Sequence, residues 1–529
     1  MLSRTIDSRR ISVILLLRLA AILLPAAISL GTGHAQINVL SANYGNDRTN
    51  ANLQETQLTP ANVATGSFGK IGTLPVDGQV YAQPLYVSGL NLPGQGVQNV
   101  LFVFTQHNSV YAYDADRVQA PVLYWSANLG PSVPTSLFDD YSDIQPEIGI
   151  LSTGVIDLQR GVLFVVSMNL VYGSPMFQLH ALDLTNGAER LNGPVFISAE
   201  AAGTGDGSWE DGVLAFDPAW QIQRPGLVLA NDAVYVCFGS HGDQGSWHGW
   251  LMTFDASDLG RQLGVFATTP NGFGGSIWQS GRAPAVDDSG NVYMITGNGD
   301  YDGVSDFGES FLKFSGATPL LVDWYTPLIW ETLSDGDEDL SAGPAFIPGT
   351  RLMVGGDKSG QLYLLDGNYM GHLAPLTSSN VQTIQAVQDS GIYDFAIWSR
   401  TDGAYVYLQE EESILKAYRI SDGTLEPTPV SVSTEWSHTS FAGLAISANG
   451  GTDGTGILWE TTGYQFDSAV DGALRAFDAS DLTHELWNSE MTGGPDRLGT
   501  FSKFAIPTVA NGKVYVPTFA GVVAVYGLL

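Results

Sequence analysis

Cysteine is almost absent from this chain, because Cys237 is the only one among 529 residues. A lone thiol excludes an intramolecular disulfide, a cysteine-rich zinc site and a Cys-x-x-Cys-His haem attachment. Basic residues are scarce as well, with 22 Lys+Arg against 54 Asp+Glu and a formal net charge of −32. Such a charge balance repels phosphate backbones, so we expect no nucleic-acid partner.

Long apolar runs are confined to the N-terminus. Arginines within residues 1–10 precede an apolar stretch over residues 11–30, and the small-residue triplet Gly-His-Ala ends at Ala35. This order is typical of a secretory signal peptide over residues 1–35, and it predicts a secreted or periplasmic product. An uncleaved anchor helix is the alternative, since about twenty mostly apolar residues can span a bilayer. After cleavage we expect no membrane span, and we expect a monomer.

Helical periodicity is nearly absent from the rest of the chain. Short alternating apolar runs, bounded by Gly, Asn, Asp and Ser, predict β-strands instead. One recurring type of strand ends in Asp, and three looser copies carry another residue there. These marker positions are Asp114, Asp183, Asp255, Ser315, Asp366, Arg419, Asp478 and Tyr526. They recur every 48 to 72 residues, enough for four short strands with their turns, which predicts a repeat architecture.

The two ends of the chain complement each other. The last repeat stops at Leu529, directly after its third strand, and residues 67–75 have the pattern of the missing fourth strand. Pairing of these ends closes a ring and removes free sheet edges, whereas an open solenoid leaves them exposed. We therefore expect an all-β protein, a single eight-bladed β-propeller with four-stranded blades over residues 36–529.

The strand-end segments resemble the repeat of pyrroloquinoline-quinone (PQQ) propeller proteins, which reads Ala-x-Asp-x-x-Thr-Gly with a Trp four residues later. Residues 181–187 (Ala-Leu-Asp-Leu-Thr-Asn-Gly) fit it best, with Leu191 in the place of the Trp. Residues 79–86 and 240–245 are similar to stretches of secreted bacterial PQQ-like proteins. The resemblance to this quinoprotein alcohol dehydrogenase-like family implies the eight-bladed fold, but one fold hosts many functions.

The resemblance also implies a cofactor site. Quinoprotein dehydrogenases of this fold hold PQQ between a Trp and a vicinal disulfide, with a Ca²⁺ ion that polarises it and an Asp that acts as the base. Cys237 alone forms no such disulfide, and without a haem motif no haem is expected. Trp278 and Trp398 are suited to stacking on a planar ring. The alternative is that both pack blade against blade.

A calcium loop is the second candidate site. Asn298, Asp300, Asp302 and Glu309 match the spacing D-x-[DN]-x-[DN]-G-x5-E, with Asn in the first position. Oxygen atoms at this spacing can surround a hard cation. The flanking segments are predicted strands rather than helices, so an acidic hairpin loop built from turn-forming residues is the alternative.

Polar residues of mixed charge lie just before or within the predicted innermost strands, where the blades crowd around the channel. If they converge, they form the concave polar pocket that is usual for a small-molecule ligand. A water-filled channel with ion pairs between blades is the alternative. These residues are Gln83, Glu147, Gln279, Arg282, Asp339, Arg400, His438 and Lys503. Among them, Arg282, Arg400 and Lys503 would form a cationic cluster suited to an anion.

The favoured interpretation is an exported propeller that binds a small-molecule, glycan or protein ligand through its channel mouth and blade loops. The first alternative is a PQQ- and Ca²⁺-dependent oxidoreductase. The second is an extracellular carbohydrate hydrolase or lyase, in which channel-mouth carboxylates such as Glu147 and Asp339 do the chemistry.

Overall fold

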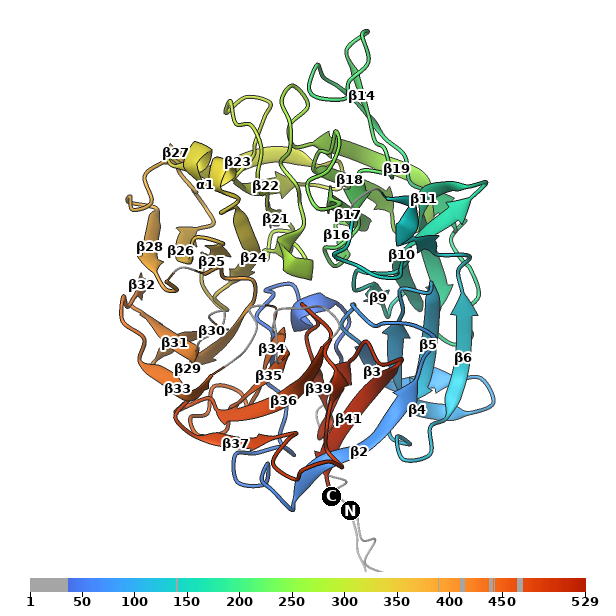
Figure 1. Cartoon of the computed structure of the whole chain (residues 1–529), viewed down its shortest axis with the longest axis vertical. Coiled ribbons are helices and arrows are strands. Elements are labelled where there is room, and N and C mark those ends of the chain that lie inside the picture. Colours follow the sequence, from blue (N-terminus) through green and yellow to red (C-terminus); the bar gives the residue numbers. More distant parts are fainter. Residues whose placement is uncertain are drawn as a thin grey trace, which may run out of the picture. The chain divides into compact units, whose positions relative to one another are not determined.

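Eight β-sheets, arranged around one axis, make up most of the part of the chain that the computed structural model describes (Figure 1). The described residues are 37–138, 141–388, 390–409, 414–436, 441, 443–463 and 470–529. Each sheet has four main strands, so the predicted eight-bladed propeller is confirmed. The described part of the chain contains no helix with the length and hydropathy that crossing a membrane requires.

The first four blades follow one another along the chain, each from its innermost to its outermost strand. Blade 1 is β3 (Leu85–Leu92), β4 (Gly96–Phe104), β5 (Ser109–Asp114) and β6 (Leu123–Asn128). Blade 2 is β9 (Val155–Asp157), β10 (Val162–Val171), β11 (Ser174–Asp183) and β12 (Val195–Phe196). Blade 3 is β16 (Val228–Ala230), β17 (Ala233–Ser240), β18 (Trp250–Asp255) and β19 (Asp258–Ala267), with β15 (Gln221–Ile222) also on β17. Blade 4 is β20 (Ala285–Val286), β21 (Val292–Ile295), β22 (Phe311–Ser315) and β23 (Leu320–Pro327), with β27 (His372–Ala374) beside β23.

The last four blades repeat the pattern. Blade 5 is β24 (Leu340–Phe346), β25 (Leu352–Asp357), β26 (Gln361–Asp366) and β28 (Val381–Gln385). Blade 6 is β29 (Phe395–Arg400), β30 (Gly403–Gln409), β31 (Ile414–Ser421) and β33 (Ser431–Trp436), with β32 (Thr424–Leu425) on β31. Blade 7 is β34 (Gly443–Ser447), β35 (Ile457–Gly463), β36 (Asp471–Asp478) and β37 (Glu485–Asn488), with β1 (Ala51–Asn52) and β38 (Gly499–Thr500) at its sides. Blade 8 is β39 (Thr508–Ala510), β40 (Lys513–Pro517), β41 (Val522–Leu528) and β2 (Phe68–Pro75).

A few short elements connect the blades. They are β7 (Val133–Pro134), β8 (Glu147–Ile148), β13 (Glu200–Ala202), β14 (Val213–Ala215), the 3-10 turns η1 (Ala42–Tyr44), η2 (Thr135–Leu137) and η3 (Gln279–Gly281), and the helix α1 (Trp330–Gly336).

The recurring Asp has a local structural role at the end of the third strand. Its side-chain Oδ1 accepts a hydrogen bond from the backbone N–H two residues later, at 2.8–3.0 Å, in five of the blades. This Asx turn starts the reversal toward the fourth strand. The residues that do so are Asp114, Asp183, Asp255, Asp366 and Asp478.

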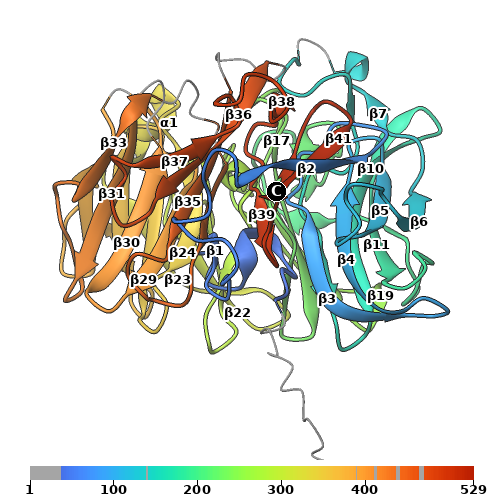
Figure 2. The same cartoon turned by 90° about the horizontal axis from the view of Figure 1, so that it is seen from below.

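The N-terminal strand β2 completes the last blade. It pairs antiparallel with β41, in a register that sets Phe68 opposite Leu528 and Leu74 opposite Val523. Figure 2 shows β2 lying along β41 beside the C-terminus. The predicted closure of the ring by residues 67–75 is thereby confirmed.

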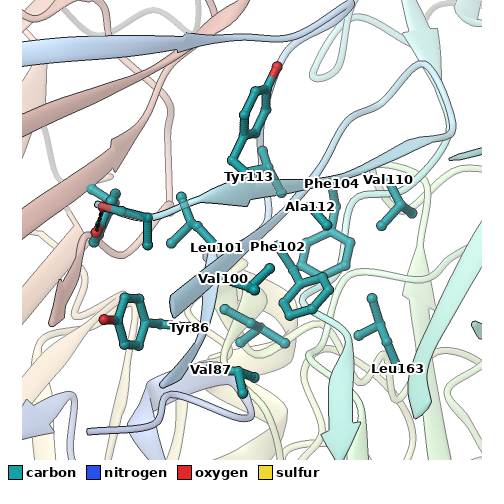
Figure 3. Close-up of a cluster of buried hydrophobic side chains, with 14 of the residues drawn as sticks. Tyr86, Val87, Val100, Leu101, Phe102, Phe104, Val110, Ala112, Tyr113 and Leu163 are labelled. Carbon is teal, nitrogen blue, oxygen red and sulfur yellow. Dashed lines mark hydrogen bonds between the residues drawn. The ribbon is translucent and has the colours of Figure 1, made fainter. Parts of the chain in front are cut away.

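The hydrophobic core lies between neighbouring blades rather than within one sheet. Phe102 and Phe104 of β4 share a cluster with Leu163 of the next blade, which Figure 3 shows, and the same cluster includes Val523 and Val525 of β41. Every blade thus packs both of its faces against apolar side chains of its neighbours, and the ring has no open end.

Residues 39–52, which we call the N-terminal girdle, pass the innermost strands of successive blades. In Figure 1 this blue segment lies in the middle of the ring. Carbonyl oxygens of the girdle accept hydrogen bonds from blade N–H groups at 2.7–3.0 Å. The acceptor and donor residues are Leu40 and Ile156, Asn46 and Val286, Asp47 and Phe346, Thr49 and Ile397, and Asn50 and Ile446. The girdle therefore satisfies backbone groups that would otherwise be unpaired around the channel.

Loss of the β2 contacts should destabilise the whole ring. Phe68 is fully buried and packs against Trp459, Trp487 and Tyr526. We expect Phe68→Ala to lower the free energy of unfolding in urea by about 3–5 kcal/mol, the usual cost of emptying an aromatic core position. The control Val97→Ala, at an exposed position of β4, should change it by less than about 0.5 kcal/mol. Equal effects of the two variants would contradict the closure.

Candidate functional site

A cavity of about 370 Å³ lies on the axis of the ring. Its lining includes residues from the segments that lead into the innermost strands of all eight blades, for example Tyr81 before blade 1, Tyr393 before blade 6 and Phe504 before blade 8. Residues from all eight blades of a ring can line one cavity only at the centre of the ring. We call this cavity the axial pocket.

Four aromatic rings form one wall of the axial pocket. Trp278, Tyr393, Phe441 and Phe504 come from four different blades, and their ring centroids lie 4.9–6.2 Å apart. Edge-to-face and tilted contacts of this kind hold the rings in place. Trp278 is only partly buried, so its ring remains available to a ligand in the pocket.

The carboxylate of Asp339 holds the indole of Trp278 in place. Its Nε1 donates a hydrogen bond to Oδ2 of Asp339 at 3.0 Å. The Nζ of Lys358 lies 2.5 Å from Oδ1 of Asp339 and 2.7 Å from Oδ1 of Asp337, and 5.6 Å from the centroid of the Trp278 ring. Burial raises the pKa of Asp339 to about 6, although Lys358 opposes this shift. Asp339 can therefore exchange a proton near neutral pH.

Two further buried carboxyl groups lie behind Asp339. Glu309 is fully buried, and its Oε2 accepts a hydrogen bond from the backbone N–H of Leu340 at 3.1 Å. Burial and the neighbouring Asp339 raise the pKa of Glu309 well above its usual range. Burial also raises the pKa of Asp357 to about 7, despite a 2.6 Å hydrogen bond from the hydroxyl of Tyr363.

The axial pocket is also lined by a buried cation, Arg224. Its guanidinium lies 5.7 Å from the ring centroid of Tyr81 and 5.8 Å from that of Phe504. Its Nη1 donates to the carbonyl oxygen of Leu151 at 3.2 Å. Among the described residues, no carboxylate lies within ion-pair distance of it. Burial lowers the pKa of Arg224 to about 10, so it is still charged at neutral pH.

The structure brings only some of the predicted channel-mouth residues together. Trp278, Asp339 and Lys503 line the axial pocket, and the Nζ of Lys503 lies 5.8 Å from the ring centroid of Phe441. Gln83 and Gln279 are instead buried in the blade interior. The Oε1 of Gln83 accepts from the backbone N–H of Asn43 at 2.8 Å, and that of Gln279 from the N–H of Ile295 at 2.9 Å.

The predicted cationic cluster is not formed. Arg282 is buried against Asp394 and the ring of Phe395, while Arg400 pairs with Asp402 and Asp453. Neither lines the axial pocket. Each of these arginines forms an ion pair with a carboxylate outside the pocket, and the spacing in the sequence does not reveal that pairing.

The remaining predicted residues lie elsewhere. Trp398 is fully buried, and its Nε1 donates to the carbonyl oxygen of Gly450 at 2.9 Å, so it packs between blades as the alternative interpretation held. Glu147 pairs with His107 at 2.9 Å and also contacts Ser132, away from Asp339. His438 lies outside the described residues.

The four residues of the predicted calcium loop point to different partners. Asp302 accepts hydrogen bonds from the backbone N–H groups of residues 304, 305 and 306, as a turn former does. Asp300 accepts one from Phe273, Glu309 is buried beside Leu340, and Asn298 lines the axial pocket. Within the described ranges, no three His, Cys, Asp or Glu side chains are grouped so that they could hold a metal ion.

Several pocket residues were not predicted from the sequence. Arg224 precedes Pro225, just as Gln83 precedes Pro84 and leads into an innermost strand, and this shared position is a signal that could have identified it. Lys358, Tyr393, Phe441 and Phe504 carry no comparable pattern. In the sequence they are ordinary loop residues, and only the closed ring places them around one axis.

Comparison with known proteins identifies the fold. No protein-family model and no curated protein matches this chain. A solved quinohemoprotein alcohol dehydrogenase from Comamonas testosteroni is similar, with 13% identity, a TM-score of 0.60, and coverage of 93% of this chain and 80% of that chain. One from Pseudomonas putida HK5 has 15% identity and a TM-score of 0.58 over 93% and 80% of the two chains. A europium-containing methanol dehydrogenase has 14% identity and a TM-score of 0.58 over 93% and 98%.

These similarities show that the chain shares the eight-bladed propeller architecture of the quinoprotein dehydrogenases, the fold that the strand-end repeat implied. At 13–15% identity they show the shared architecture alone. What the axial pocket binds has to be inferred from its own side chains.

The hydrogen bond between Trp278 and Asp339 gives the pocket a measurable titration. We expect the tryptophan fluorescence contributed by Trp278, taken as the difference between the native protein and Trp278→Phe, to change with a midpoint near pH 6. Below that pH the carboxyl is neutral, and above it Trp278 donates to a carboxylate. Asp339→Asn should remove the transition. A midpoint near pH 4, the ordinary range of Asp, would show that burial does not raise the pKa of Asp339.

Proposed function

We propose that this protein binds a small planar organic molecule in the axial pocket, and that it does so after export from the cytoplasm. The observation that carries the proposal is the wall of four aromatic rings drawn from four blades around a cavity of about 370 Å³. Pockets of this size with aromatic walls and a few polar groups are typical small-molecule sites. The predicted signal peptide supports export.

The polar groups favour a ligand with several oxygen atoms. Lys503 lines the cavity with an ammonium group and Asn298 with an amide oxygen, while Asp339 offers an acceptor whose protonation changes near pH 6. Trp278 supplies the stacking surface, because Asp339 and Lys358 hold the indole in one orientation. A planar ring bearing carbonyl, hydroxyl or carboxylate substituents matches this arrangement.

Ligand binding can be tested with Trp278→Leu. We expect isothermal titration with PQQ and other planar quinones and aromatic acids to show binding to the native protein. We expect the variant to lose at least tenfold in affinity, because it lacks the stacking ring. Trp209→Leu is the matched control, since Trp209 is 54% exposed and does not line the pocket. An equal loss in both variants, or no binding by any compound, would refute the proposal.

A second candidate function is PQQ- and cation-dependent oxidation. The observation that favours it is the amide oxygen of Asn298, which is buried without a partner among the described residues, in a side chain whose nitrogen contacts two carboxylates. The Nδ2 of the same side chain lies 2.8 Å from Asp337 and 3.4 Å from Asp243. Carboxylate and amide oxygens are the ligands that Ca²⁺ and similar hard cations prefer. The shared fold with a europium-containing methanol dehydrogenase adds support.

The residues present fit a bound quinone in part. Trp278 would lie against one face of it, with Lys503 near its acidic substituents, and bound PQQ supplies the electron acceptor for the oxidation. Asp339 is the group placed to take a proton. The vicinal disulfide implied by the family resemblance cannot form from Cys237 alone, so any second face would have to come from the aromatic wall.

Dye reduction by the purified protein tests this second function. With PQQ and either Ca²⁺ or Eu³⁺, we expect primary alcohols or sugars to reduce the dye. Asp339→Asn should lower the rate about 100-fold or more, the usual contribution of a positioned base. Asp335→Asn is the matched control, because Asp335 is an exposed carboxylate of α1 outside the pocket. Binding of PQQ without dye reduction would refute oxidation and leave the binding proposal intact.

A further inference from the structure

Three arginines are buried in the segments beside the innermost strands although the protein as a whole is acidic. Arg48, Arg224 and Arg282 are all buried, and the carboxylate that pairs with them is that of Asp394, bound to Arg282. Arg48 donates to the carbonyl oxygens of Pro284 at 2.7 Å and of Ala42 at 2.8 Å, and to the hydroxyl of Ser41 at 3.0 Å. Within the part of the chain that the structure describes, neither Arg48 nor Arg224 has a carboxylate within ion-pair distance.

Both unpaired arginines keep their charge. Burial lowers the pKa of Arg48 to about 9 and that of Arg224 to about 10, and both values remain above neutral pH. A charge removed from water without a partner is strongly unfavourable, so buried charges are normally paired. The described side chains therefore supply no negative charge that would balance Arg48 and Arg224.

Three hydrogen-bond donors without a partner among the described residues indicate where a negatively charged ligand would bind. The Nη2 of Arg224, the Oγ of Ser152 and the Nε2 of Gln83 have no hydrogen-bond partner among the residues that the structure describes, and their residues are only 7%, 0% and 2% exposed. Each residue lies just before the innermost strand of its own blade, in blades 3, 2 and 1.

Two hydrogen bonds bring these three residues close together. The Nη1 of Arg224 donates to the carbonyl oxygen of Leu151, and the backbone N–H of Gln83 donates to Oγ1 of Thr153 at 2.9 Å. Ser152 lies between those two acceptors in the chain. The Oε1 of Gln83 already accepts from Asn43, so its Nε2 remains as a free donor.

We propose that Arg224, Ser152 and Gln83 form a buried binding site for a small anion, either a halide or a small free carboxylate such as formate. An amide N–H, a guanidinium N–H and a hydroxyl can all donate to one negative centre. A water molecule would satisfy some of these donors but would leave the guanidinium charge uncompensated. The site does not depend on the proposed aromatic ligand, because the unpaired charge belongs to the protein alone.

Crystals of the native protein grown with bromide in place of chloride test the site directly. We expect an anomalous bromide peak within hydrogen-bond distance of Arg224 and Ser152. A water molecule or nothing at that place, with bromide only on the surface, would mean an adventitious ion only and would overturn the proposal.

Thermal unfolding at constant ionic strength separates the two sources of the anion. Replacing methanesulfonate, which is neither a halide nor a carboxylate, by bromide should raise the Tm of the native protein in a saturable way if a halide binds. Replacing methanesulfonate by formate should do so if a carboxylate binds. Either response supports the site, and the absence of both overturns it.

Variants connect the response to the named residues. We expect Arg224→Met to abolish the Tm response and Ser152→Ala to raise the half-saturating anion concentration at least tenfold. Arg261→Met is the matched control, since Arg261 is an exposed arginine paired with Asp255. If Arg224→Met does not fold, Ser152→Ala and the native bromide crystals still decide the question. An unchanged response in Ser152→Ala together with Arg224→Met would refute this site.

Discussion

The pairing of β2 with β41 is the constraint on which the rest of this structure depends. Each blade is apolar on both faces, so it must be packed on both sides to stay out of water. A chain that ended in a free blade would expose one such face at each end, together with an unpaired strand edge. Closing the ring with a strand from the other end of the chain removes both costs at once, and it sets eight inner strands around one axis.

The axial pocket is a consequence of that closure. Tyr81, Trp278, Tyr393 and Phe504 are separated by up to 423 positions in the chain, yet all line one cavity because each precedes an inner strand. The same geometry brings ionisable side chains together around the pocket. Asp339, Glu309 and Asp357 are buried near one ammonium group, that of Lys358, while Arg224 has no carboxylate within ion-pair distance among the described residues. A pocket with such perturbed groups is more often a functional site than a structural accident.

Local features of the fold were predictable because their causes are local. The Asp that ends a third strand is part of an Asx turn only two residues long, so its recurrence along the chain reveals the blades. Ring closure was predictable for a related reason: the last repeat lacks a strand and residues 67–75 supply one. The site was predictable only in part. Trp278, Asp339 and Lys503 were identified as pocket residues, but Arg282, Arg400 and Glu147 have carboxylate or cationic partners outside the pocket.

The sequence by itself determined the strand-rich architecture, the number of blades, the closing strand and the strongly acidic charge balance, because periodicity, turn residues and composition are properties of neighbouring residues. Only the tertiary structure decided which charges are paired. Arg282 and Arg224 both precede innermost strands, yet Arg282 meets Asp394 from another blade and Arg224 meets aromatic rings. Those encounters follow from the radius and register of the closed ring, which no stretch of sequence contains.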